Sequence, residues 1–418
     1  MSTSLAASLA ASTPRFTLSL PKLGGVSPGA TLFAGLALLI GAAAIGQAVS
    51  PRQAALYLLG GALGLVLYHA AFGFTSAWRV FIADRRGAGL RAQMVMLAVA
   101  TSLFFPVLAA GSLFGQPVQG IVAPIGVSVA FGAFIFGVGM QLGGGCASGT
   151  LYTVGGGSTR MLLTLAFFIV GSTVGAAHFH WWTDLPTLPK TSLVRLWGPW
   201  TALALNLAVF AAIAALTVVL EKRRHGSLSL DKPSPRRGLA RFARGPWRLV
   251  AGAVALAIGN FLTLALAGKP WGITSAFALW GSKIADGVGI EAWSWPYWST
   301  PERLAELEGS VLSDVTSVMD FGIIAGALLA AGLAGRFAPT WRIPWRSGLA
   351  AVVGGLLLGY GARLAYGCNI GAYFSGIASG SVHGWVWLVF AFAGNVIGTA
   401  VRPLFGLEVE RTPKLAGC

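Results

Sequence analysis

Charged side chains are scarce in this chain of 418 residues, of which only 10% are Asp, Glu, Lys or Arg. Soluble proteins average about 25% charged residues, so this chain cannot cover a folded core with a wetted surface. Apolar stretches instead recur from end to end, and each is near the ~20 residues that cross the hydrocarbon of a bilayer. The composition therefore predicts an all-α polytopic membrane protein.

Cysteine and acidic residues are scarce as well. Three cysteines with no C-x-x-C pair exclude a disulfide framework and a zinc site. The net charge of +16 indicates basic cytoplasmic loops in a membrane protein rather than a nucleic-acid partner. It would also concentrate anions near the membrane. No phosphate loop, dinucleotide fingerprint or metalloprotease motif occurs. We therefore expect no cofactor, no metal and no enzymatic activity.

Ten apolar stretches have the length of a membrane span, and their charges predict their orientation. They are 29–49, 54–72, 92–110, 121–142, 160–180, 198–220, 249–267, 319–335, 347–366 and 383–401. Four shorter segments, at 73–84, 147–157, 272–285 and 369–380, begin at a glycine or two residues after one. The basic 221–248 loop is expected in the cytoplasm, and the acidic 286–318 loop outside, with Trp293, Trp295 and Trp298 at the membrane interface.

One motif, G-x-G-x-x-L-x-x-G-C-x-x-G, is present twice in the chain. The copies begin at Gly137 and Gly359 and carry Cys146 and Cys368, 222 residues apart. Two Gly-x-Thr-Ser-Ala segments, from Gly73 and Gly272, also match. Each half then has five spans and two short segments. Because five is odd, the second half is expected to be inverted relative to the first, with a site between the repeats near the midplane.

The repeat predicts the following division of the chain. The first repeat covers 29–220, with re-entrant segments near 73–84 and 147–157, and its last span, 198–220, begins the second repeat by symmetry. The second repeat covers 249–401, with re-entrant segments near 272–285 and 369–380. The basic loop 221–248 joins the repeats, and tails 1–28 and 402–418 are expected in the cytoplasm.

The two cysteines are the first candidates for a binding site. Glycine destabilises a helix interior by about 1 kcal/mol relative to alanine, so each glycine-rich stretch predicts a break. Each Gly-Cys would then start a short helix, whose N-terminus favours anions. The candidate substrate-binding residues are Cys146, Cys368, Gly145, Gly367, Ser148, Asn369, Thr75, Ser76, Thr274, Ser275 and Arg363. The alternatives are structural: cysteines that pack as small hydrophobes, hydroxyls that bond to the helix backbone, and an arginine paired within the fold.

At these motifs the sequence resembles the YeeE/YedE family of bacterial inner-membrane sulfur transporters. The resemblance rests on Gly-Gly-Cys146-Ala-Ser-Gly-Thr150 and Tyr-Gly-Cys368-Asn-Ile-Gly-Ala-Tyr373, and extends to both Thr-Ser-Ala segments. It implies an hourglass-shaped fold with re-entrant helices meeting at the centre. It also implies thiosulfate uptake through transient S–H···S contacts with a relay of cysteines, and a cytoplasmic sulfur carrier of the TusA type as partner.

The chain departs from this family pattern in its first short segment. There the pattern has a further cysteine, and this chain has Phe72-Gly73-Phe74. The leading hypothesis is uptake of thiosulfate or a related small sulfur anion. Two alternatives stay open at this point: transport of another sulfur or selenium solute, and an intramembrane thiol oxidoreductase that uses Cys146 and Cys368 as a redox pair.

Overall fold

The computed structural model describes residues 25–229 and 238–409. Within these ranges ten helices are long and apolar enough to cross a membrane. The main helices of these spans are α1 (Pro28–Ala48), α2 (Pro51–Ala70), α4 (Ala88–Ala110), α5 (Val127–Gly143), α7 (Thr159–Ala177), α9 (Leu193–His225), α11 (Leu249–Ala267), α14 (Val315–Ala334), α15 (Trp345–Leu364) and α17 (Val382–Val401). In three of them the span also includes the short element that follows, so that it runs to Asp84, Gly155 or Phe405. Each overlaps one expected span, which confirms the all-α polytopic class.

Short elements occupy the four segments that were expected to be too short to span. They are α3 (Phe74–Asp84), α6 (Ala147–Gly155), α12 (Thr274–Gly287) and the π-helical η4 (Asn369–Ser375), which α16 (Gly376–Ala378) continues. The remaining helices are α8 (Phe179–Thr183), α10 (Gly238–Arg244) and α13 (Pro301–Glu308), with the 3₁₀ turns η1 (Ala292–Ser294), η2 (Pro296–Trp298), η3 (Val311–Ser313) and η5 (Arg402–Phe405). Strand β1 (Ser112–Leu113) pairs with β2 (Gln116–Pro117), and β3 (Ile125–Gly126) with β4 (Thr187–Leu188), both antiparallel.

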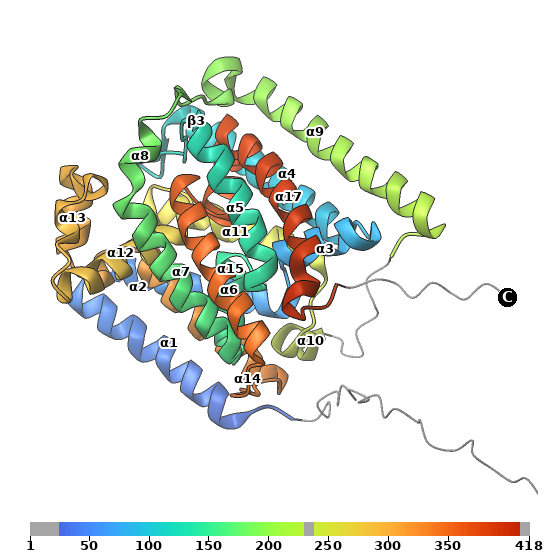
Figure 1. Ribbon diagram of the computed structural model, residues 1–418, viewed down its shortest axis with the longest axis horizontal. Coiled ribbons are helices and arrows are strands. Elements are labelled where there is room, and N and C mark those ends of the chain that lie inside the picture. Colours follow the sequence, from blue (N-terminus) through green and yellow to red (C-terminus); the bar gives the residue numbers. More distant parts are fainter. Residues whose placement is uncertain (1–24, 230–237, 410–418) are drawn as a thin grey trace, which may run out of the picture.

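The long helices pack against one another in pairs. α15 lies against α5 and α7, α17 against α5, and α14 against α2. α1 and α9 run along the outside of this bundle (Figure 1) and bury little of their surface. Their exposed leucines and phenylalanines are the expected surface for lipid contact.

Glycine lets the central helices approach backbone to backbone. A side chain at Gly64 would collide with the carbonyl of Ile323 across the α2–α14 contact. Gly137 and Gly394 meet the carbonyls of Ala391 and Phe134 in the same way between α5 and α17. Small residues are the usual means of close helix packing in membranes, where lipid supplies no hydrophobic drive between helices.

Several boundaries differ from the sequence expectation for local reasons. α14 begins at Val315 rather than 319, because the Asp314 carboxylate caps it by accepting from the amides of Thr316 and Ser317. α5 begins at Val127 rather than 121, since the preceding residues form β3. α9 extends to His225 and is kinked at Gly198, where φ is 75°. It therefore occupies the start of the expected 221–248 loop, and α10 lies further along that loop.

The acidic 286–318 segment is folded rather than a simple loop. It contains η1, η2, α13 and η3. Trp298, expected at the membrane interface, is instead 2% exposed and donates to the Ser282 hydroxyl of α12 at 3.0 Å. That part of the prediction is wrong, because tertiary packing recruits the indole into the protein interior. Cys418, most of the tail 1–28 and part of the tail 402–418 lie outside the described residues.

Candidate functional site

The first glycine break places Cys146 at the start of α6. Gly144, with φ of 92°, ends α5, and Cys146 is the N-cap residue of α6. Its Sγ accepts from the amide of Gly149 at 3.4 Å and lies 3.3 Å from the Ser148 hydroxyl. The side chain is buried, so its polar contacts come from the first turn of its own helix.

The second break places Cys368 at the start of η4. Tyr366 (φ 56°) and Gly367 (φ 145°) turn the chain out of α15. The Cys368 Sγ accepts from the amide of Ile370 at 3.4 Å. Beside it, Asn369 is fully buried, and neither polar atom of its side chain has a partner among the described residues. Buried amides are normally paired, so an unpaired Asn369 side chain is unusual.

The structure brings the two breaks together, because α6 packs against η4. Each break is also fixed by a side chain from the helix that follows it. Arg160 of α7 donates to the carbonyls of Leu142 and Gly143 at 2.7 and 2.8 Å, and His383 of α17 lies 3.0 Å from the carbonyl of Ala365. These contacts satisfy carbonyls that a helix end leaves unpaired.

The four candidate hydroxyls lie at the starts of α3 and α12. Thr75 is buried, and its hydroxyl has no partner within the described ranges. Ser76 donates to the Gly73 carbonyl at 3.2 Å. Ser275 donates to the Thr316 hydroxyl at 3.1 Å, and Thr274 is 3% exposed. Ser76 and Ser275 thus have partners within the protein, whereas the buried Thr75 hydroxyl has none among the described residues.

Arg363 lies at the end of α15 and turns toward the 286–318 segment. Its Nη1 donates to the Tyr297 hydroxyl at 2.6 Å, and its guanidinium carbon lies 4.9 Å from the centre of that ring. The arginine thus links α15 to η2. This contact agrees with the structural alternative named from the sequence, an arginine paired within the fold.

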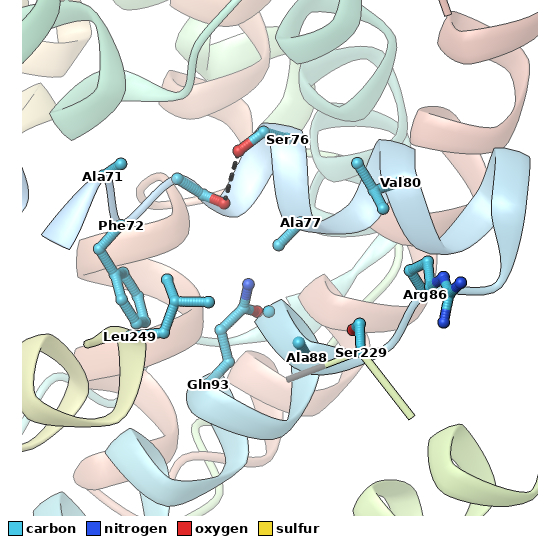
Figure 2. Close-up of a pocket in the computed structure, with 12 residues that line it drawn as sticks. Ala71, Phe72, Ser76, Ala77, Val80, Arg86, Ala88, Gln93, Ser229 and Leu249 are labelled. Carbon is cyan, nitrogen blue, oxygen red and sulfur yellow. Dashed lines mark hydrogen bonds between the residues drawn. The ribbon is translucent and has the colours of Figure 1, made fainter. Parts of the chain in front are cut away.

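A pocket of about 250 Å³ opens beside the start of α3 (Figure 2). Phe72, Gly73, Ser76 and Gln93 are among its lining residues, and Arg86 lies at its edge. Figure 2 shows the Gln93 amide directed toward the space beneath Ala77. The pocket lies beside Phe72 and Gly73, in the segment where the sequence resemblance led us to expect a further cysteine.

Gln93 connects this pocket to the second break. Its Oε1 accepts from the Trp78 indole at 2.9 Å and from the Tyr373 hydroxyl at 3.5 Å. Tyr373 belongs to η4, which Cys368 begins. A buried path of polar groups therefore runs from the cysteine break toward the pocket.

One buried carboxylate pairs with Arg86 at the edge of the pocket and with Arg91 beside it. Glu221 of α9 accepts from Arg91 at 2.7 Å, from Arg86 at 3.3 Å and from the Gly87 amide at 3.1 Å. The carboxylate thereby fixes the turn between α3 and α4, which forms one wall of the pocket.

Sequence reasoning missed several buried polar residues of the interior. Gln141 donates to the Thr75 carbonyl at 3.1 Å and to Asn395 at 2.6 Å. Asn260 donates to Ser375 of η4 at 3.1 Å and accepts from the Trp271 amide at 2.9 Å. The sequence does hold one indication of such residues. An asparagine or glutamine that stands alone in an otherwise apolar span indicates a polar contact between helices.

A bundle of membrane-crossing helices that encloses two thiols and unpaired polar groups at its helix breaks defines a membrane transporter. The chain belongs to the sulphur transport family, whose profile matches residues 69–397. This confirms the resemblance seen in the sequence, and with it the expectation of a transporter rather than an enzyme.

Relatives match this chain over two different lengths. "Thiosulfate transporter TsuA" of Spirochaeta thermophila is 27% identical over 81% of this chain and 95% of its own length. TsuA of Escherichia coli is 27% identical over 81% and 91%. "Probable transporter YedE" of Escherichia coli is 31% identical over 39% of this chain, and the chain spans only 40% of that relative's length.

Proposed function

We propose that this protein takes up thiosulfate, or a closely related small sulfur-containing anion, across the bacterial inner membrane. The observation that carries the proposal is the pair of buried thiols, Cys146 and Cys368, at the starts of two short helices that pack together. Two relatives matched along most of their length are named thiosulfate transporters, which supports this choice of substrate.

The chemistry of the two breaks suits an anion with a sulfur end and an oxygen end. The thiols of Cys146 and Cys368 donate hydrogen bonds to the terminal sulfur of the anion. Donor and acceptor are then both sulfur atoms, which are soft and polarizable. Amides at the start of α6 and η4, with Ser148 and Asn369, hold the oxygens. Gly145 and Gly367 keep the backbone beside each thiol free of side chains.

In this proposal, polar residues at the starts of α3 and α12 extend the anion path on either side of the two cysteines. Thr75 offers a free hydroxyl, while Ser76, Thr274 and Ser275 line the same two helix starts. Arg363, held by Tyr297, adds positive charge at a greater distance, where it attracts an anion without binding it. The pocket of Figure 2 is the exit to the cytoplasm in this scheme.

The proposal includes the topology expected from the repeats. The two halves, 29–220 and 249–401, are inverted, with the span 198–220 (α9) beginning the second repeat by symmetry. The short elements α3, α6, α12 and η4 with α16 are re-entrant, and both termini lie in the cytoplasm. The two breaks then meet near the midplane in an hourglass shape. Handover to a TusA-type carrier would take place at the basic cytoplasmic face, where Arg86 and Arg91 lie.

The test is growth on thiosulfate as the sole sulfur source, in a bacterium that lacks its own sulfate and thiosulfate uptake. We expect growth with the unaltered protein and none with Cys146→Ala or Cys368→Ala, at equal amounts of protein in the membrane. Cys418→Ala is the matched control, because it removes the third cysteine, outside both motifs, and should leave growth unchanged.

Two outcomes would contradict parts of this proposal. Full growth of both motif mutants would rule out a relay of thiols. A failure of the unaltered protein to support growth on thiosulfate would redirect the search to other sulfur or selenium solutes, which the same assay tests one at a time.

A further inference from the structure

Asp320 is a buried carboxyl group that the proposed path does not use. It lies in α14 with no exposed surface, and neither carboxylate oxygen has a hydrogen-bond partner in the parts of the chain that the structure describes. An ionised carboxylate in such surroundings is strongly disfavoured, so the group is neutral and holds a proton. Intramembrane acids of this kind are typical of proton pathways.

The position of Asp320 on its helix places it between two of the short helices. Thr316, Asp320 and Ile324 are four residues apart and share one face of α14. Thr316 accepts from Ser275 at the start of α12, and a side chain at Gly155 of α6 would collide with the Ile324 carbonyl. Asp320 therefore lies between the contacts of α14 with α12 and with α6.

Asp320 is also within electrostatic range of the cysteine site. α14 packs against α6, and α6 packs against η4, the element that Cys368 begins. An ionised Asp320 would repel an anion held beside Cys368, whereas the neutral acid would not. The protonation state of Asp320 thus decides whether an anion is tolerated at the second break.

The elements packed against α14 are α1, α2, α6, α10, α12 and η3. α1 and η3 carry no titratable residue. The titratable residues of the others are Arg52, Tyr57, Tyr68, His69, Tyr152, Arg241, Arg244, Lys283 and Asp286, with Cys146 capping α6. Tyr57 and Lys283 donate to the carbonyls of Ala37 and Leu307. None of these groups donates a hydrogen bond to Asp320 among the described residues.

We propose that Asp320 is a proton-binding site that couples anion passage to proton movement. A proton from the outer aqueous phase adds to the carboxylate and forms the neutral acid. The anion passes in that state, and the O–H bond then breaks, which regenerates the carboxylate and releases the proton to water on the inner side. One proton enters with each anion. This proposal rests on the proposed anion transport for its cargo, but the proton site itself is independent of which anion is carried.

The experiment uses the full-length protein in liposomes, with thiosulfate as the probe and the membrane potential clamped. For one coupled proton, an inward pH gradient raises the limiting accumulation of thiosulfate about tenfold per pH unit. We expect this dependence in the unaltered protein and in Glu308→Gln, which removes an exposed carboxylate of α13. Asp320→Asn should equilibrate thiosulfate without any response to the gradient.

A gradient response in Asp320→Asn equal to that of the unaltered protein would overturn the proposal, as would no response in the unaltered protein. If Asp320→Asn fails to fold, Asp320→Glu serves instead, with a shifted pH dependence expected. Infrared spectroscopy gives a readout that needs no transport: a carboxylic-acid band at neutral pH, lost in Asp320→Asn. Absence of that band refutes the proton site, whereas absence of thiosulfate uptake with the band present refutes only the proposed cargo.

Discussion

The two cysteine breaks share one backbone plan and differ in their polar chemistry. Gly144 of the first copy corresponds to Tyr366 of the second, and both adopt positive φ, 92° and 56°. After the cysteine, the first copy forms the regular helix α6 and the second the π-helical η4. π-helical turns are rare and occur often at functional sites.

The difference extends to the groups beside each thiol. Cys146 has the Ser148 hydroxyl at 3.3 Å, whereas the corresponding residue after Cys368 is Ile370, which offers only its amide. The second copy instead carries Asn369, whose polar atoms are unpaired within the described ranges. The comparison indicates that the Cys146 thiol already has hydrogen-bond partners in its own helix. Beside Cys368, in contrast, the polar atoms of Asn369 remain available to a ligand.

The largest effect should come from the glycines that precede the cysteines. At Gly367, with φ of 145°, an added Cβ would lie 2.8 Å from the Ala372 amide nitrogen, in a backbone region that other residues rarely adopt. Gly367→Ala is expected to abolish thiosulfate uptake and to destabilise the protein by about 2–3 kcal/mol. Uptake assays and thermal unfolding in detergent measure both.

Gly145→Ala is the matched variant of the first break. Its added Cβ would meet its nearest atoms at 3.1 Å, and Gly145 has no positive φ. Part of the uptake should therefore survive. Equal losses at the two glycines would show that the breaks are more alike than their backbones indicate.

An intermediate effect is expected from the polar neighbours. Asn369→Ala should raise the KM for thiosulfate about tenfold, since one or two hydrogen bonds to a charged ligand are lost. Ser148→Ala should raise it only about twofold to threefold, because that hydroxyl contacts the Cys146 sulfur rather than an empty site. Concentration-dependent uptake gives both values. A larger effect at Ser148 than at Asn369 would reverse the assignment of the two sites.

The smallest effect on transport is expected at the turn itself. Gly144→Ala places a residue with a side chain in a backbone conformation of positive φ. The added Cβ would also lie only 2.6 Å from Arg160 Nη1. It should destabilise the protein by about 1–2 kcal/mol while uptake per folded molecule stays nearly unchanged. Tyr366→Asn is the matched variant of the second break, because asparagine tolerates the positive φ that Tyr366 adopts. A large loss of uptake in Gly144→Ala would show that the turn takes part in transport.

The sequence predicts most of the scaffold and only part of the candidate site. Apolar length located all ten helices, and glycine with cysteine located α6 and η4. The cap at Asp314 and the burial of Trp298 were missed, because they depend on contacts that hydropathy does not encode. The π-helical form of η4 and the unpaired state of Asn369 and Asp320 also depend on tertiary packing. Asp320 lies inside the expected span 319–335, but it has no second acidic residue beside it that would have marked a proton relay in the sequence.

The backbone-to-backbone contacts of the long helices have a consequence for how the protein works over time. Helices locked through Gly64, Gly137 and Gly394 cannot slide or rock without separating main chains that touch. We expect these helices to form a stationary frame, and the breaks at Cys146 and Cys368 to be the moving parts. Transport would then proceed by small adjustments at the centre of the molecule rather than by movement of whole domains.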